Sequence, residues 1–164
     1  MSTVVGIPAH ALWVHLIVVL MPATALLEIA CALWSAARQR LVWLVLSMAV
    51  LLVVTTPITI DAGEWLYGQE KHHTAILQTH VDRGEQLTYY AVALLVVAVA
   101  LVVMHWQQRR SERVSSVATI AVGVLALIVG VASTVAVVRT GDPGARSVWH
   151  ASSINPTLHL APSG

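Results

Sequence analysis

Four long apolar segments constrain the fold of this chain more than any other feature. They run from about residue 10 to 34, 41 to 60, 87 to 106 and 117 to 138. A helix needs about 20 apolar residues to cross the hydrocarbon core of a bilayer, so each segment is long enough. A spanning segment must satisfy its own backbone hydrogen bonds, which favours helices. The sequence therefore predicts an all-α membrane protein, a bundle of four transmembrane helices.

The composition favours one membrane domain covering residues 1–164. Hydrophobic residues make up 57% of the chain and charged residues 10%, whereas soluble domains carry about 25% charged residues. A formal net charge of +1 gives no basic face for nucleic acid, so none is expected as a partner. No Lys or Arg precedes the first apolar segment, which therefore lacks the start of a signal peptide and is expected to remain as a helix.

Arginines predict the orientation of the bundle. Short connections at 35–40 and 107–116 make two antiparallel hairpins. Both connections are basic, and their arginines are Arg38, Arg40, Arg109, Arg110 and Arg113. By the positive-inside rule, both connections face the cytoplasm. The N-terminus, the loop from 61 to 86 and the tail at 139–164 are then extracytoplasmic, which makes the protein N-out and C-out.

The segments outside the spans give further expectations. From about Gln69 the outer loop lacks proline, and His73, His80 and Leu87 recur at helical spacing. We expect an extracytoplasmic amphipathic helix that leads into the third span. The tail from Arg139 is rich in Gly, Pro and Ser and is expected to form an irregular cap.

Small residues mark one face of the fourth span. Gly123, Ala126 and Gly130 are of the type that lets membrane helices approach closely. They predict a helix–helix contact at this face.

Eight histidines are unusual in so small a membrane protein. Most of them map to the outer face, and histidine is the commonest metal ligand. Haem b held by two histidines would be served best by His15 and His80, although their depths differ by on the order of 15 Å. His10 and His80 are expected to lie at more similar depths, but this pair would be more exposed. A divalent metal ion could instead be held by residues from several elements, namely His10, His15, His80, Asp61 and Glu64.

Glu28 stands apart because it lies within the first span, about 9 Å from its inner end. Intramembrane carboxyl groups are rare and are functional hypotheses by default. His105, at the inner end of the third span, is the candidate partner, and the Ser47 hydroxyl is another. The alternative is a protonated or hydrogen-bonded packing residue.

Several short motifs resemble a bacterial membrane protein family, domain of unknown function 2231. The segment from His10 to His15 resembles the family's opening His-Pro-x-x-Val-His, with Ala11 in place of proline. The family also carries an acidic residue thirteen positions after the second histidine, which is Glu28 here. The segment 62–64 resembles its Thr/Ala-Gly-Glu motif, 80–85 its His-Glu-x-x-Gly-Glu motif, and 140–149 its closing motif. The resemblance implies a bacterial plasma membrane protein, and it selects His10, His15 and His80.

The sequence contains no recognisable enzyme motif. Its features support three hypotheses of function. The preferred hypothesis is a component of a membrane redox system that binds haem b or a divalent metal through His10, His15 and His80, because some family relatives carry iron–sulphur domains. The first alternative is an accessory subunit of a larger membrane or respiratory complex, or a homo-oligomer, without a cofactor. The second is a small proton or ion transporter that uses Glu28.

Overall fold

Four helices make up almost all of the computed structural model, which describes residues 3–4, 7–67, 75–110 and 115–154, with side chains at 13–61, 86–110 and 115–140. The helices are α1 (Ala9–Leu33), α2 (Ser35–Tyr67), α3 (Ala75–Arg109) and α4 (Ser116–Ile154). Before them, β1 (Thr3–Val4) and β2 (Ile7–Pro8) form a short antiparallel pair, with Val4 opposite Ile7.

Each helix contains a segment long and apolar enough to cross a membrane. These segments are Trp13–Leu33, Ser35–Asp61, Gln86–Arg109 and Ser116–Thr140. Large apolar side chains are exposed along all four, as expected where the surroundings are lipid. The predicted bundle of four transmembrane helices is therefore confirmed.

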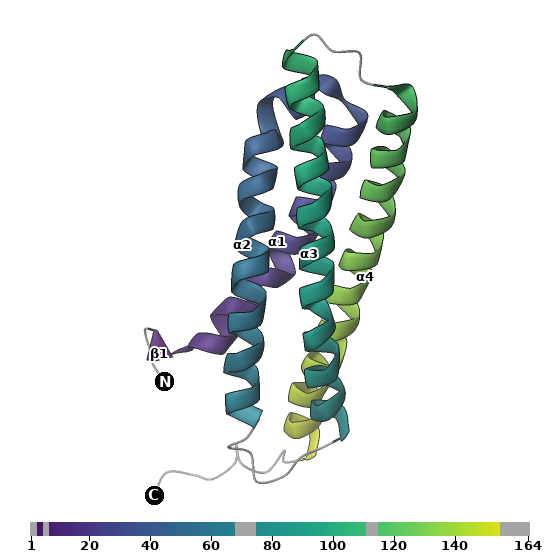
Figure 1. Ribbon diagram of the computed structural model, residues 1–164. Coiled ribbons are helices and arrows are strands. Elements are labelled where there is room, and N and C mark those ends of the chain that lie inside the picture. Colours follow the sequence, from purple (N-terminus) through teal and green to yellow (C-terminus); the bar gives the residue numbers. More distant parts are fainter. Residues whose placement is uncertain (1–2, 5–6, 68–74, 111–114, 155–164) are drawn as a thin grey trace, which may run out of the picture.

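The helices form a ring in which each packs against its neighbours in sequence and α4 returns to α1. The α1–α2 and α3–α4 connections lie at one end, which we call the turn end. The opposite end, where α2 finishes and α3 begins, is the loop end. In Figure 1, α1 is inclined to the other helices, and its first turns swing away from the bundle at the loop end. Sequence order and short connections thus determine which helices are neighbours.

The first hairpin is tighter than the sequence predicts. Only Trp34 separates α1 from α2, and its N–H donates to the Ala30 carbonyl at 2.9 Å. The expected connection at 35–40 is therefore wrong, because these residues form the first turns of α2. Arg38 and Arg40 consequently lie on a helix.

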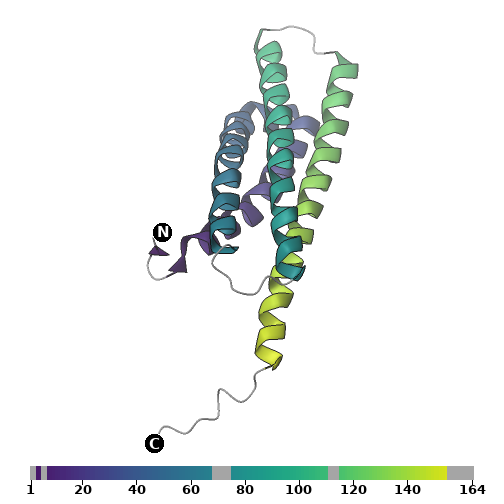
Figure 2. The ribbon, with the colours of Figure 1, turned by 60° about the horizontal axis from the view of Figure 1, so that its bottom comes forward.

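Two segments outside the spans are more helical than their composition suggests. The helix expected before the third span is confirmed in its backbone, since α3 begins at Ala75. The irregular tail expected from Arg139 is wrong as far as Ile154, because α4 continues to that residue and extends past the other helices (Figure 2). Gly and Pro in this stretch are confined to 141–144, where they disfavour a helix, and the residues from 145 to 154 contain neither of them.

The core follows a repeat of alternating four- and three-residue steps on every helix. The buried residues at these steps are Ile17, Met21, Thr24, Glu28 and Cys31 on α1; Arg38, Val42, Val45, Ala49 and Leu52 on α2; Leu87, Ala91, Leu94, Ala98, Leu101 and His105 on α3; and Ala126, Gly130, Ser133, Val137 and Thr140 on α4. Such spacing is typical of helices packed at small crossing angles. Glu28, Arg38 and His105 therefore occupy positions that would ordinarily hold apolar side chains.

The small residues of α4 do not all contact another helix. A Cβ atom on Gly130 would lie 3.1 Å from Ile29 Cδ1 and 3.3 Å from Ala25 Cβ, so α4 approaches α1 closely there. Ala126 is fully buried one turn earlier. A Cβ on Gly123 would meet no atom of the described residues within 4 Å. The predicted contact is thus confirmed at Ala126 and Gly130 and is wrong at Gly123.

Candidate functional site

Three ionisable side chains are buried together in the turn-end part of the core. The exposed fraction is 0% for Glu28, 1% for His105 and 3% for Arg38. Glu28 lies little more than one helical turn before the end of α1, His105 about one turn before the end of α3, and Arg38 in the first turn of α2. We call these three residues, with Cys31 and Gln108, the turn-end cluster.

Arg38 links three helices. Its Nη1 donates to the Cys31 carbonyl at 2.9 Å and, more weakly, to the Ala32 carbonyl at 3.5 Å, while its Nε donates to Gln108 Oε1 at 3.2 Å. The last carbonyls of a helix have no partner within the helix and carry partial negative charge. Arg38 therefore caps α1 from α2 and also holds α3.

Glu28 has no comparable partner. Both of its carboxyl oxygens are buried and have no hydrogen-bond partner among the described residues, and the same is true of His105 Nδ1. The other candidate partner, Ser47, is exposed and donates to the Trp43 carbonyl on its own helix at 2.9 Å. Because buried polar groups are nearly always paired, these atoms call for an explanation. The pairing of Glu28 with His105 stays a prediction.

Arg38 is the group common to both sides of the cluster. It donates to the carbonyl of Cys31, three residues after Glu28 on α1, and to Gln108, three residues after His105 on α3. The close contact of α4 at Gly130 covers the turn of α1 that carries Glu28, which helps to keep water from the carboxyl group.

On the loop-end side of Glu28, the described buried polar side chains are of a different kind. They are hydroxyls, and each donates to a carbonyl of its own helix three or four residues earlier. These residues are Thr24, Thr55, Thr56, Thr59, Ser133 and Thr140. Such bonds satisfy the hydroxyl without a second helix. These bonds account for the burial of the six hydroxyls.

The residues predicted for a cofactor or metal lie near the loop end. His15 is exposed on α1, and Asp61 is exposed where the second span finishes. The backbone places His10 in the first turn of α1 and His80 in the first turns of α3, before the span that begins at Gln86. The side chains of His10, His80 and Glu64 lie outside the described residues. Within the described part of the chain, no three His, Cys, Asp or Glu residues gather as a metal site would require.

Sequence reasoning missed Arg38 and Gln108 as members of the site. The signal was present, because Arg38 continues the core repeat of α2 one step before Val42. An arginine in a connecting turn is evidence only for the orientation of the bundle. An arginine on the buried face of a helix belongs to the core.

A comparison with protein families agrees with this architecture. Residues 6–154 match the family described as predicted membrane protein (DUF2231), and the chain belongs to this family. A comparison with curated proteins and with solved structures finds no match.

Proposed function

We propose that this member of the DUF2231 family is a small proton-conducting membrane protein and that Glu28 carries the proton. The proposal rests on one observation, a fully buried carboxyl group without a hydrogen-bond partner among the described residues. An ionised carboxylate without donors is among the most costly groups to hold in a membrane core. Gain or loss of a proton at Glu28 must therefore be coupled to a change in its surroundings.

The chemistry of the turn-end cluster favours a proton over a metal cation. Ca²⁺ and Mg²⁺ need several oxygen ligands, and the cluster offers one carboxyl group and the Gln108 amide. The guanidinium of Arg38 opposes the approach of any further cation. A proton needs one acceptor at a time, which Glu28 and His105 can each supply.

His105 supplies a second proton-binding group between Glu28 and the turn end. Imidazole binds and releases protons near neutral pH and has two nitrogens that can act in sequence. His105 lies about one turn from the end of α3, in the same part of the core as Glu28. If Arg38 leaves the Cys31 carbonyl, its charge becomes available to stabilise the Glu28 carboxylate. Arg38 would then control when Glu28 gives up its proton.

The loop-end side of the route begins at Thr24, one turn before Glu28 on the same buried stripe. Its hydroxyl donates to the Leu20 carbonyl at 2.7 Å and keeps lone pairs that can accept a hydrogen bond. Water that enters between the helices would connect Thr24 to the loop end. The orientation predicted from the arginines would make the turn end the cytoplasmic one.

Proton flux into liposomes tests this function. We expect the purified protein, reconstituted with a pH-sensitive dye inside the vesicles, to conduct protons under an imposed membrane potential. Glu28→Gln should reduce the flux to that of protein-free liposomes, and His105→Gln should slow it severalfold. Asp61→Asn is the matched control, since it removes an exposed carboxyl group from α2 and should leave the flux unchanged. A wild-type flux no greater than that of empty vesicles, or one that survives Glu28→Gln, would refute the proposal.

The redox function remains a separate proposal. It would use His10, His15 and His80 to bind haem b, or these with Asp61 and Glu64 to bind a divalent metal. Neither the family to which the chain belongs nor the described side chains test this function. An optical spectrum and metal analysis of the purified protein, repeated for His15→Ala, would test it directly.

A further inference from the structure

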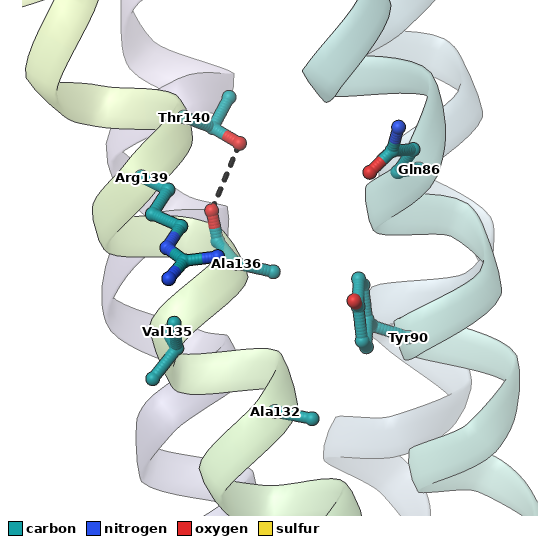
Figure 3. A pocket seen from close by; sticks show the side chains of 7 residues that line it. All are labelled: Gln86, Tyr90, Ala132, Val135, Ala136, Arg139 and Thr140. Carbon is teal, nitrogen blue, oxygen red and sulfur yellow. Dashed lines mark hydrogen bonds between the residues drawn. The ribbon is translucent and has the colours of Figure 1, made fainter.

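A second site lies between α3 and α4 at the loop end, away from the turn-end cluster. It is a pocket of about 340 Å³, near the lower limit for small-molecule sites. Its polar lining comes from Gln86 and Tyr90 on α3 and from Arg139 and Thr140 on α4. Ala132 and Ala136 on α4 line its deeper part. Figure 3 shows the α3 side chains facing α4 across this space.

The pocket has the polarity of an amphiphile. Gln86 directly precedes the third apolar segment, and Arg139 and Thr140 directly follow the fourth, so the polar lining lies at the edge of the hydrocarbon layer. Ala132 lies two turns further into the fourth span. A ligand that enters from the membrane would therefore place its polar group beside Gln86 and Thr140 and its apolar part beside the alanines.

Arg139 selects the charge of that polar group. Its side chain runs back along α4 towards Ala136 (Figure 3), because side chains on a helix lean towards its N-terminus. The exposed guanidinium thus lies beside the apolar lining of the pocket. Its five N–H donors suit a ligand with several acceptor oxygens, and guanidinium binds phosphate through two parallel hydrogen bonds.

The alanines make room for a hydrocarbon chain. Ala132 and Ala136 are one turn apart on the same face of α4, and Tyr90 lies opposite them. Larger side chains there would close the gap between α3 and α4. Val135 also lines the pocket, and it is exposed on α4, as are the nearby Val131 and Val138. A pocket of this volume holds a head-group phosphate and the start of an acyl chain, while the rest of the chain lies along α4.

We propose that the pocket between α3 and α4 binds an anionic phospholipid, with its phosphate on Arg139 and the beginning of one acyl chain against Ala132 and Ala136. This site is separate from the proton route, and the two proposals can fail independently. The lipid would fasten α4 to α3 at the end of the bundle that has no short turn between them.

Lipid-dependent thermal stability of the full chain tests the site. Purified protein in a neutral detergent is titrated with phosphatidylglycerol, phosphatidylcholine, oleate or inorganic phosphate. We expect phosphatidylglycerol to raise the melting temperature at lower concentration than the other three. Arg139→Gln should weaken this effect about tenfold, as expected for the loss of a charge-assisted hydrogen bond. Arg110→Gln, an exposed arginine at the turn end, is the matched control and should change nothing.

A second variant tests the acyl part of the site without altering charge. Ala132→Leu should also weaken the effect of phosphatidylglycerol, whereas Ala121→Leu, on an exposed position of α4, should not. Equal stabilisation by phosphatidylcholine, or an unchanged titration of Arg139→Gln, would overturn the proposal. A stronger effect of oleate would assign the pocket to a fatty acid instead, and an equal effect of inorganic phosphate would remove the acyl chain from it.

Discussion

The two halves of the bundle treat buried polar groups in opposite ways. Towards the loop end the described polar core residues are hydroxyls, such as Thr56, which donates to the Leu52 carbonyl of its own helix at 2.7 Å. Towards the turn end they are ionisable, and their bonds cross between helices or are not made at all. Arg38 joins three helices, while Glu28 and His105 Nδ1 have no partner among the described residues.

This difference separates buried polar groups that fit the packing of the helices from buried polar groups whose presence packing does not explain. A hydroxyl bonded to its own helix costs little and places no demand on neighbouring helices. An unpaired carboxyl group lowers stability and persists in proteins mainly where function requires it. Four substitutions measure this contrast, beginning with the one expected to change the free energy of unfolding most.

Arg38→Met should destabilise the bundle by about 3 kcal/mol. The change removes charge-assisted hydrogen bonds and takes the partner from the buried Cys31 carbonyl and the half-buried Gln108 amide. Equilibrium unfolding in mixed micelles would measure it. Arg40→Met, at an exposed position on the same helix, is the control and should change stability by no more than about 0.5 kcal/mol. Equal losses for the two variants would show that Arg38 is not a structural link.

Glu28→Met should stabilise the protein by about 2 kcal/mol while abolishing proton flux. The substitution replaces an unpaired buried carboxyl group with an apolar side chain of similar length, which removes a desolvation cost. The same unfolding measurement checks it, beside the liposome assay. A loss of stability would mean that Glu28 has partners in the folded protein, and it would then be a packing residue.

Gly130→Val should destabilise the bundle by about 1.5 kcal/mol. The added methyl groups would force Ile29 and Ala25 away, because even a Cβ would lie 3.1 Å from Ile29 Cδ1. Gly123→Val is the matched control on the same helix, where a Cβ meets no described atom within 4 Å. If Gly123→Val costs as much, the loss does not come from the approach of α4 to α1.

Thr56→Val should have the smallest effect, about 0.5 kcal/mol or less. The side chain keeps its shape, and the Leu52 carbonyl keeps the backbone hydrogen bond of the helix after the hydroxyl is lost. Thermal unfolding of Thr56→Val beside Arg38→Met would compare the two halves directly. A large loss would show that the loop-end hydroxyls also serve contacts between helices.

Local sequence carried enough information to predict the spans. Each apolar segment satisfies its own backbone, so its length and composition decide that it is a helix. Helix ends were less well predicted, because a helix can continue past the hydrocarbon layer. The segment around Arg38 contains no Gly or Pro and continued as a helix. The tail after Arg139 also continued as a helix, although Gly141, Pro143 and Gly144 predict an end there.

The candidate site was predicted in part. Glu28 and His105 could be singled out because an ionisable residue inside or at the end of an apolar segment is rare. The role of Arg38 could not be predicted while its segment was taken for a turn. The pocket at Arg139 had no signal at all, since it depends on the spacing of Tyr90 from two alanines on another helix.

The sequence by itself therefore determined the four helices, their pairing in two antiparallel hairpins and the rarity of a carboxyl group in the first of them. These properties depend on single segments and short connections. Only the tertiary structure decided which polar groups are paired. The hydrogen bonds from Arg38 to α1 and α3 require that residues on three helices lie at the same depth and that each helix is rotated to face the others. The tertiary structure also decided that Glu28 points into the core with no hydrogen-bond donor among the described residues, which is the feature from which a function can be proposed.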